Sequence, residues 1–445
     1  MSTAAVTPRE TIVGRVVLPH DPSYEQLRGT FVHTGSPAVV VRCHTDEDVA
    51  SAIRYARAND LVLSIRSGGH SGAGFGTNDG GLVIDVSPID AVEVVDRRAG
   101  IVRIGTGTKW IDVARALGRH GLALSSGDTT SVGVGGLMLG GGIGWMVRKH
   151  GLAIDSLVAA EVVTANGHVL RASAEEHTDL FWAIRGGGGN FGVVTTFEVA
   201  AHPIETVLFG TVMYPRVDAG AVLRGWRDYT RTASDDVTTT ARLFPAFGGP
   251  QPHLNIALCH AGSDAAIART EIEPLLRLGT VIEQDITRMP YADVLDDASD
   301  LPVSWQPRVK NRFARDCSDD LIDTVTATAG NLDAMYVELR NLGGAFGRVP
   351  SDATAFAYRD SEVMLTTALL GSPEDNLKVA AEFDKFWRAL TPFIAGAYGN
   401  FLSTTGTDDV ASIYPPDTYA RLAAVKRTYD PQNVFDQNHN IAPSR

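Results

Sequence analysis

The sequence is poor in cysteine and has no long apolar run. Only three cysteines occur among 445 residues, Cys43, Cys259 and Cys317, and their wide spacing excludes a disulfide framework and a zinc cluster. We therefore expect buried core cysteines and no metal site. No stretch approaches the roughly 18 apolar residues of a membrane-spanning helix, and the first residues lack the basic and apolar regions of a secretory signal. These absences predict a cytoplasmic protein without a membrane partner.

Positive charge is also scarce. The 39 lysines and arginines are outnumbered by 52 acidic residues, for a formal charge of −13, which argues against nucleic acid as a partner. No glycine is followed by Lys-Ser or Lys-Thr, as a Walker loop requires. A G-x-G-x-x-G string at Gly187, Gly189 and Gly192 precedes the strand-like run Val193–Val199. A dinucleotide fingerprint needs a helix there, so this string is not one.

Glycine is plentiful in two places, and the first is the run I-R-S-G-G-H-S from Ile65 to Ser71. Apolar runs at 61–63 and 82–84 flank it, which predicts a strand, a tight loop and a second strand. Consecutive glycines let backbone N–H groups point into one concavity, an arrangement that suits a pyrophosphate. His70 at the end of the loop either lies against a cofactor, is bonded to it, or faces solvent.

The second place is Gly127–Gly144, where seven of the last twelve residues are glycine. Each glycine costs roughly 0.5–1 kcal/mol of backbone entropy relative to alanine. The interleaved valines, leucines and Ile143 argue against a linker, because linkers are polar. We expect this backbone to lie flat against a large planar ligand.

Regular elements follow from the local patterns. Thr45 is predicted to cap a helix whose first turn carries three acidic residues. The expected strands are Val39–Cys43, Leu82–Val86, Val92–Val95 and Val102–Gly105. After Pro203 the pattern changes to strands alternating with amphipathic helices, whose apolar stripes are predicted to face a core: Val222, Leu223 and Trp226; Ile267, Ile272, Leu275 and Leu276; and Val379, Phe383, Phe386 and Leu390.

Four segments together carry a resemblance. The two glycine-rich loops, D-L-F-W-A-I-R-G-G-G-G-N-F-G-V-V-T (179–195) and Y-D-P-Q-N-V-F-D-Q-N-H-N-I (429–441) resemble the berberine-bridge-enzyme-like FAD-linked oxidases. This family belongs to the vanillyl-alcohol oxidase and p-cresol methylhydroxylase superfamily. The sequence looks similar to its bacterial members of the 6-hydroxy-D-nicotine oxidase-like and polyketide-tailoring kinds.

The resemblance implies an α+β fold in three parts. Residues 1–203 would form a two-subdomain FAD-binding half of the p-cresol methylhydroxylase type. Residues 204–408 would form the substrate half, an antiparallel sheet covered by helices on one face and roofing the flavin with the other. Residues 409–445 would return to the FAD-binding half.

The resemblance also assigns roles near the flavin. The family attaches the flavin 8α-methyl group to the histidine at the position of His70. Many members add a second link from a cysteine where this chain has Thr129, which cannot form a thioether, so a single covalent link is expected. Val132 stands where a small residue tends to admit oxygen to the flavin. The other cofactor-binding positions are Arg66, Ser67, Gly68, Gly69, Ser71, Thr130, Gly133, Gly135, Gly136, Gly141, Gly142, Gly144, Asp155, Gly192, Val194, Asn438 and Asn440.

Two further positions near the flavin complete this set, one of which departs from the family pattern. Leu137 stands where the family often has histidine, so one polar group near the cofactor is missing. His439, between Asn438 and Asn440 in the tail, is expected near the isoalloxazine ring, where amides can hydrogen-bond its polar atoms.

Catalytic candidates lie in the substrate half. Tyr398 and Asn400, in A-Y-G-N-F, match the family's Y-x-N-[YF] segment, in which the tyrosine often takes a proton. A phenol titrates near pH ~10, so Tyr398 needs activation. Tyr336, Glu338 and Arg340 alternate with apolar residues, which places them on one face of a strand. That face either lines the substrate pocket or is a solvated edge; Glu338 would be a second base or an anchor for a cationic amine.

The favoured function is an FAD-dependent oxidase acting on a small molecule, within secondary metabolism. Hydride would pass from a C–H bond alpha to O or N to flavin N5, and O2 would be reduced to H2O2. The alternatives are a flavin-dependent tailoring cyclase or oxygenase, a dehydrogenase, and a non-redox flavoprotein that only binds or cyclises its ligand. A redox-silent protein would not need a base at Tyr398. The chain is expected to be a monomer or a homodimer.

Overall fold

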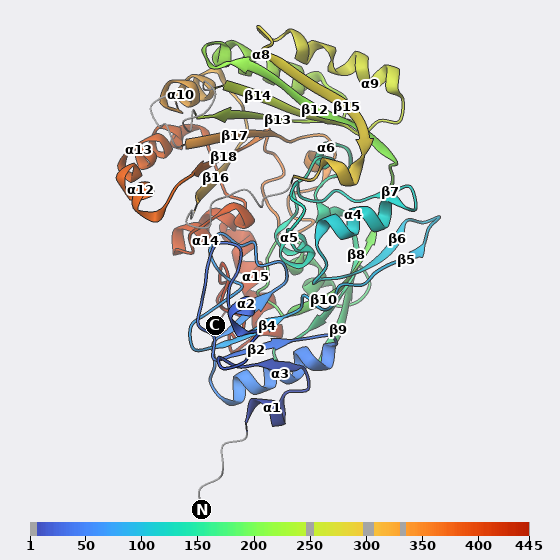
Figure 1. The fold of residues 1–445 in the computed structure, drawn as a ribbon, viewed down its shortest axis with the longest axis vertical. Helices are drawn as coiled ribbons and strands as arrows, with labels where there is room; N and C mark the ends of the chain where they lie inside the picture. The colour runs from blue at the N-terminus through green and yellow to red at the C-terminus, as the bar shows by residue number, and fades with distance from the viewer. Residues whose placement is uncertain (1–6, 246–252, 297–306, 330–334, 445) are drawn as a thin grey trace, which may run out of the picture.

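The computed structural model describes residues 7–245, 253–296, 307–329 and 335–444. They form three main sheets, with the largest lying above the other two in Figure 1. None of the helices in these ranges is long and apolar enough to cross a membrane. Cys43, Cys259 and Cys317 are buried and free, as expected for core cysteines.

The first sheet is the N-terminal layer of the molecule. Its strands run in the order β1-β2-β4-β3, and β2–β4 and β3–β4 pair in parallel. The strands are β1 (Arg15–Val17), β2 (Val39–Arg42), β3 (Leu63–Arg66) and β4 (Leu82–Asp85), and the helices are α1 (Pro8–Thr11), α2 (Tyr24–Leu27) and α3 (Asp46–Ala58). Thr45 caps α3 by accepting a hydrogen bond from the Asp48 amide, as predicted.

The second sheet is antiparallel, in the order β5-β6-β10-β8-β9. Its strands are β5 (Val92–Asp96), β6 (Ile101–Gly105), β8 (Leu157–Val163), β9 (Val169–Ser173) and β10 (Val193–Ala200). The helices of this region are α4 (Trp110–Gly118), α5 (Val134–Gly140), α6 (Val147–His150) and α7 (Thr178–Ile184), and β7 (Leu122–Ala123) pairs with β11 (His202–Pro203). The expectation that 127–144 lies flat throughout is wrong, because its middle coils into α5.

The third sheet has seven strands, all in antiparallel pairs, in the order β15-β12-β14-β13-β17-β18-β16. The strands are β12 (Thr206–Pro215), β13 (Val237–Phe244), β14 (His253–His260), β15 (Glu283–Pro290), β16 (Arg308–Ala314), β17 (Met335–Asn341) and β18 (Val363–Leu369). Helices α8 (Ala219–Thr232), α9 (Ala265–Ile272), α10 (Asp319–Ala329), α12 (Pro373–Lys378) and α13 (Ala380–Leu390) lie on the side away from the other sheets (Figure 1).

Apolar side chains join these helices to the sheet. Trp226 of α8, Val325 of α10 and Phe386 of α13 share one core with Val337 and Leu339 of β17. Ile267 is an exception, because 54% of it is exposed. The α9 helix ends at Ile272 and continues as the 3₁₀ helix Glu273–Arg277, which shifts the helical phase.

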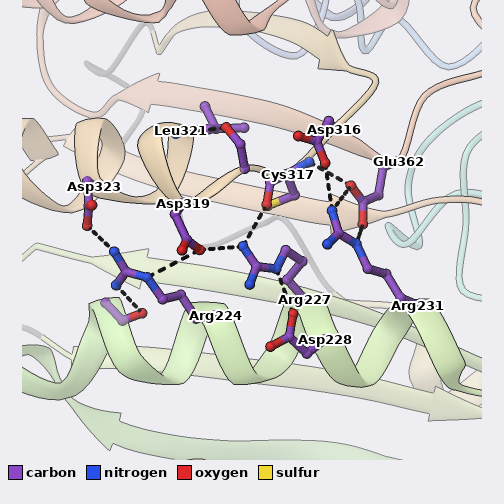
Figure 2. A network of polar contacts seen from close by, with 12 residues as sticks. Arg224, Arg227, Asp228, Arg231, Asp316, Cys317, Asp319, Leu321, Asp323 and Glu362 are labelled. Carbon is purple, nitrogen blue, oxygen red and sulfur yellow. Dashed lines mark hydrogen bonds and ion pairs between the residues drawn. The ribbon is translucent and has the colours of Figure 1, made fainter.

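An ion-pair network ties α8 to α10 on the outer surface (Figure 2). Three arginines one helical turn apart on α8 pair with carboxylates before and within α10, and also with Asp228 of α8 and with Glu362 before β18. Arg224 pairs with Asp319 and Asp323, Arg227 with Asp228 and Asp319, and Arg231 with Asp316 and Glu362. Most of these carboxylates are well exposed, so each pair contributes little to stability.

The chain then returns to the lower half of the molecule, which contains the first and second sheets (Figure 1). Helix α11 (Ala345–Arg348) packs against α6, and α14 (Thr407–Ile413) and α15 (Pro416–Tyr429) lead into the tail. The second sheet region ends with β11 and the third sheet begins at Thr206. The domain limits 1–203, 204–408 and 409–445 stay a prediction, and the second boundary falls within α14.

Candidate flavin and substrate site

The two glycine-rich loops touch backbone to backbone at Gly68 and Gly133. A Cβ atom added at either glycine would overlap the backbone nitrogen of the other. The Ser67 hydroxyl donates to the Thr106 carbonyl at 2.6 Å and accepts from the Gly135 amide at 3.3 Å. Glycine is required here because the backbones approach more closely than any side chain allows.

The loop after β3 carries unused hydrogen-bond donors. No described residue accepts a hydrogen bond from the backbone N–H of Gly68, Gly69, His70 or Ser71. The loop borders a cavity of about 420 Å³, which also has Thr30, Phe31, Lys109 and Ser131 in its wall. Consecutive free amides beside a lysine suit an anionic phosphate group, so these residues fit the pyrophosphate of FAD.

Arg66 supports this loop from below. Its guanidinium donates to the Leu27 and Gly29 carbonyls and pairs with Asp85 at 3.2 Å. Arg66 is therefore engaged with the protein, and it holds the loop rather than offering a free charge to the cavity.

His70 lies at the edge of this cavity. Its ring stacks on Phe31, with centroids 4.5 Å apart and an angle of 18°. Burial and the nearby charge of Lys109 lower the pKa of His70, against a hydrogen bond to the Ser131 backbone. A lowered pKa keeps the imidazole neutral near pH 7, and the neutral ring is the nucleophilic form.

Thr129, Thr130 and Val132 occupy the loop between β7 and α5. The Thr130 amide donates to the Asp296 carbonyl at 2.9 Å, and the Val132 carbonyl accepts from the Trp110 amide at 3.0 Å. The Val132 side chain is half-buried and packs against the core of the second sheet. Both backbone bonds hold the loop in one path past Ser131 and His70.

Tyr398 is buried where this loop meets the third sheet. Its hydroxyl oxygen accepts hydrogen bonds from the Gly142 amide and the Asn400 side chain, both at 2.9 Å. Asn311 of β16 fixes its backbone by bonding both its amide and its carbonyl. Burial raises the pKa of Tyr398 to about 12, although the two donors and the charge of Arg340 act in the opposite direction.

Glu338 belongs to a buried charged cluster on β17. Its Oε1 accepts from Arg340 at 2.8 and 3.0 Å, and its Oε2 accepts from the Tyr336 hydroxyl at 2.6 Å. Arg340 also reaches the Asp128 carboxylate at 2.6 Å and the Ile143 carbonyl at 3.2 Å. Tyr336, Glu338 and Arg340 therefore share one face, which is buried against the lower half and is not a solvated edge.

Asp128 is the partner of this cluster from the loop before Thr129. Burial disfavours the ionised carboxyl, but the charges of Arg340 and Arg242 outweigh that cost and lower the pKa of Asp128. The ion pair between Asp128 and Arg340 joins the second glycine-rich loop to the third sheet, the sheet predicted to bind substrate.

The tail brings the predicted amides into the lower half. Asn438 and Asn440 each have a buried side-chain oxygen without a hydrogen-bond partner among the described residues, so both fit contacts to a cofactor. His439 instead bonds the Thr404 carbonyl and packs edge-on against Phe75. A fully buried pair, Lys426 and Asp430, 2.7 Å apart, anchors the tail.

Three predicted cofactor-binding residues make protein contacts instead. Arg359 binds both oxygens of Asp155, at 2.7 and 2.8 Å. Gly192 lets β10 approach Val162 and Val163 of β8, and Val194 lies in the core of the second sheet. These contacts give each residue a structural role, and its contact with the cofactor stays a prediction.

The remaining glycines allow tight packing of the same loop. Gly141 and Gly142 have φ values of 139° and 80°, which favour glycine. A Cβ at Gly144 would overlap the Ser126 carbonyl, whereas one at Gly136 would meet no protein atom within 4 Å.

Sequence reasoning missed Lys109, Phe31, Asn311, Asp128 and Arg242. Asp128 lies in the second glycine-rich run but was given no role there, and the other four come from segments outside the recognised motifs. Only Arg242 had a local signal, since it follows Thr238 and Thr240 at alternate positions of one strand.

The chain matches two family models. Residues 37–173 match an FAD-binding domain, and residues 397–442 match the berberine and berberine-like family. These spans contain both glycine-rich loops, Tyr398, Asn400 and the tail.

Individual relatives match over almost the whole chain. (R)-6-hydroxynicotine oxidase of Paenarthrobacter nicotinovorans is 32% identical, over 100% of this chain and 99% of its own. Chitooligosaccharide oxidase of Gibberella zeae is 26% identical, over 92% of this chain and 87% of its own. The crystal structure of 6-hydroxy-D-nicotine oxidase from Arthrobacter nicotinovorans superposes with a TM-score of 0.87 at 28% identity, covering 97% of this chain and 98% of that one.

Proposed function

This chain belongs to the berberine and berberine-like family of FAD-linked oxidoreductases and is an FAD-dependent oxidase, and we propose that it oxidises a small molecule of secondary metabolism at a C–H bond alpha to O or N. When bound, FAD accepts the hydride at N5 and passes the two electrons to O2, giving H2O2. The observation that carries the proposal is the Tyr398 hydroxyl, buried and held by two donors at the junction of the Gly-rich loop and the substrate sheet.

The free amides of Gly68, Gly69 and Ser71, with Lys109 beside them, would hold the pyrophosphate. The unpaired amide oxygens of Asn438 and Asn440 would face polar atoms of the cofactor. We infer that His70, kept neutral by burial, carries the one covalent link to the flavin.

A visible spectrum before and after acid precipitation tests the link. A yellow pellet from the wild type and a colourless pellet from His70→Ala support it, and Thr129→Ala should keep a yellow pellet. Flavin that stays in the supernatant of the wild type contradicts it.

Tyr398 would take the substrate proton at its hydroxyl oxygen. The Gly142 amide and the Asn400 side chain would stabilise the phenolate, and the charge of Arg340 acts in the same sense. Glu338 is less suited to this role, because both of its oxygens already accept hydrogen bonds from the protein. Its part is to hold Tyr336 and Arg340.

Val132 would leave room for O2 beside the flavin. Replacement by leucine should slow reoxidation of reduced protein by air, while anaerobic reduction by substrate stays near the wild-type rate. Stoichiometric peroxide supports an oxidase. Substrate loss without flavin bleaching would support a non-redox protein, and unchanged reoxidation in Val132→Leu would contradict the role of this residue.

A further inference from the structure

A row of polar residues crosses the seven-stranded sheet on the face turned toward the lower half. The strand register places Asn255 beside Arg242, Arg242 beside Glu338, and Glu338 beside Thr366. Asn255 Oδ1, Arg242 Nε and Thr366 Oγ1 are buried and have no hydrogen-bond partner in the described part of the chain. Since a buried polar atom without a partner is unfavourable, three in a row indicate a surface that a ligand completes.

Arg242 is the strongest donor in this row. Only 15% of its side chain is exposed, and its nearest carboxylate contact, Glu338 Oε2, is 3.5 Å away. That oxygen already accepts from the Tyr336 hydroxyl. A guanidinium has five N–H donors, and the buried Nε–H of Arg242 makes no hydrogen bond to a described residue.

The charges around Arg242 select the type of acceptor. Asp128 and Glu338 supply two negative charges and Arg340 and Arg242 supply two positive ones, so these four side chains balance. Asp296, a further carboxyl that interacts with Arg242, is exposed, so solvent screens its charge. A cationic amine would meet two guanidinium groups and no unoccupied oxygen of Glu338. A carboxylate would leave one buried negative charge uncompensated, whereas a carbonyl oxygen would satisfy Arg242 without changing the balance.

Aromatic rings flank the same row. Phe244 stacks on His253 at 5.0 Å and meets the edge of Tyr336 at 5.2 Å. On the other side, the Arg242 guanidinium lies 5.4 Å from the Trp145 ring centroid. Rings on both sides of a donor favour a planar, conjugated ligand.

We propose that Arg242 determines substrate specificity, by donating to a neutral oxygen acceptor, such as a ketone, on a planar aromatic substrate, and that the site discriminates against cationic amines. This inference rests on the proposed function, because it places the substrate of the oxidase on this sheet face.

Three probes of one shape test the proposal by calorimetric titration of the flavin-loaded protein. They are 2-acetylnaphthalene, 2-naphthoate and 2-(aminomethyl)naphthalene, which differ in charge at one substituent. We expect the ketone to bind at least about tenfold more tightly than the amine, and more tightly than the carboxylate. Equal or tighter binding of the amine, or no measurable binding of the ketone, overturns the proposal.

Two variants locate the effect. Arg242→Met should weaken ketone binding about tenfold or more, the loss expected for a hydrogen bond to a charged group, and Arg277→Met on the outer surface should not. Arg242→Lys keeps the buried charge but lacks the planar guanidinium, so it should lower ketone affinity about threefold or more, which keeps the test available if Arg242→Met folds poorly. Unchanged ketone affinity in a folded Arg242→Met, or in Arg242→Lys when that is the variant available, refutes the assignment. Acid-stable flavin and peroxide production are measured separately, so failure of the oxidase proposal remains distinguishable.

Discussion

The close contact between the two glycine-rich loops requires a residue without a side chain at Gly133. Its φ of −76° and ψ of 145° are open to any residue, so alanine would cause no backbone strain there. The added Cβ, however, would lie 2.7 Å from the Gly68 Cα, where carbon atoms normally approach to about 3.5–4.0 Å. Gly133→Ala should therefore push the Gly68 loop away by about 1 Å.

The free-energy cost of Gly133→Ala can be estimated from the measured cost of overpacking. Overpacking a filled site costs about 1–3 kcal/mol. Because every 1.4 kcal/mol is tenfold in affinity, the noncovalent binding of FAD that precedes its attachment to His70 should weaken by roughly 5- to 150-fold. An unfolding entropy of about 2.1 cal/mol/K per residue gives roughly 0.9 kcal/mol/K for this chain, so Tm should fall by only about 1–3 °C.

The assay is the ratio of flavin to protein absorbance after purification, with Tm from differential scanning calorimetry. Gly118→Ala is the matched control, because a Cβ at this last residue of α4 would meet nothing within 4 Å. We expect a large loss of flavin with a small change in Tm for Gly133→Ala alone. Wild-type flavin content in Gly133→Ala would refute the argument from close approach.

Three further predictions concern proton transfer, anchoring and pH. Tyr398→Phe should slow anaerobic flavin reduction about 10²–10⁴-fold, with flavin content unchanged; a wild-type reduction rate in stopped flow would remove Tyr398 as the base. Lys426→Met leaves a buried carboxylate unpaired, which should cost about 3–5 kcal/mol in denaturant unfolding, and a loss below about 1 kcal/mol would contradict this. His150 and His202 stack at 3.6 Å, and burial lowers both pKa values, that of His150 to about 3. Their folded pKa values lie below the unfolded value of about 6.5, so the stability they contribute is full above that pH and falls as pH drops below it. In His150→Phe the free energy of unfolding should fall less between pH 6.5 and 5 than in the wild type. An unchanged slope of unfolding free energy against pH would refute the assignment.

Features set by neighbouring residues were predictable from the sequence. The hydroxyl of Thr45 and the carboxylate of Asp48 lie three positions apart, so the start of α3 needs no tertiary information. The alternation through β17 likewise separates Met335, Val337 and Leu339, which pack against the helices, from the three polar residues that alternate with them. Ile267 failed because helical spacing shows which residues share a face but not which face the sheet covers.

Which residues form the charged cluster could not be predicted from such local patterns. Glu338 and Arg340 could be placed on one face, yet the choice between a pocket and a solvated edge depended on Asp128, which is about 200 residues away in the chain. A separation of 256 residues likewise divides Tyr398 from Gly142, whose amide holds its hydroxyl. Only the packing of the sheet on the Gly-rich loop brings these groups together.

That packing also changes what Glu338 can do. Sequence alone allowed a base or an anchor for an amine, since an isolated glutamate offers two free oxygens. In the folded chain Arg340 takes one oxygen and Tyr336 takes the other. The carboxylate is thereby committed to holding the cluster, while Arg242, which the motifs did not single out, keeps an Nε–H without a hydrogen bond to a described residue. The donor that we propose for substrate recognition is therefore placed by strand register, which sets Arg242 beside Glu338, rather than by any contiguous motif.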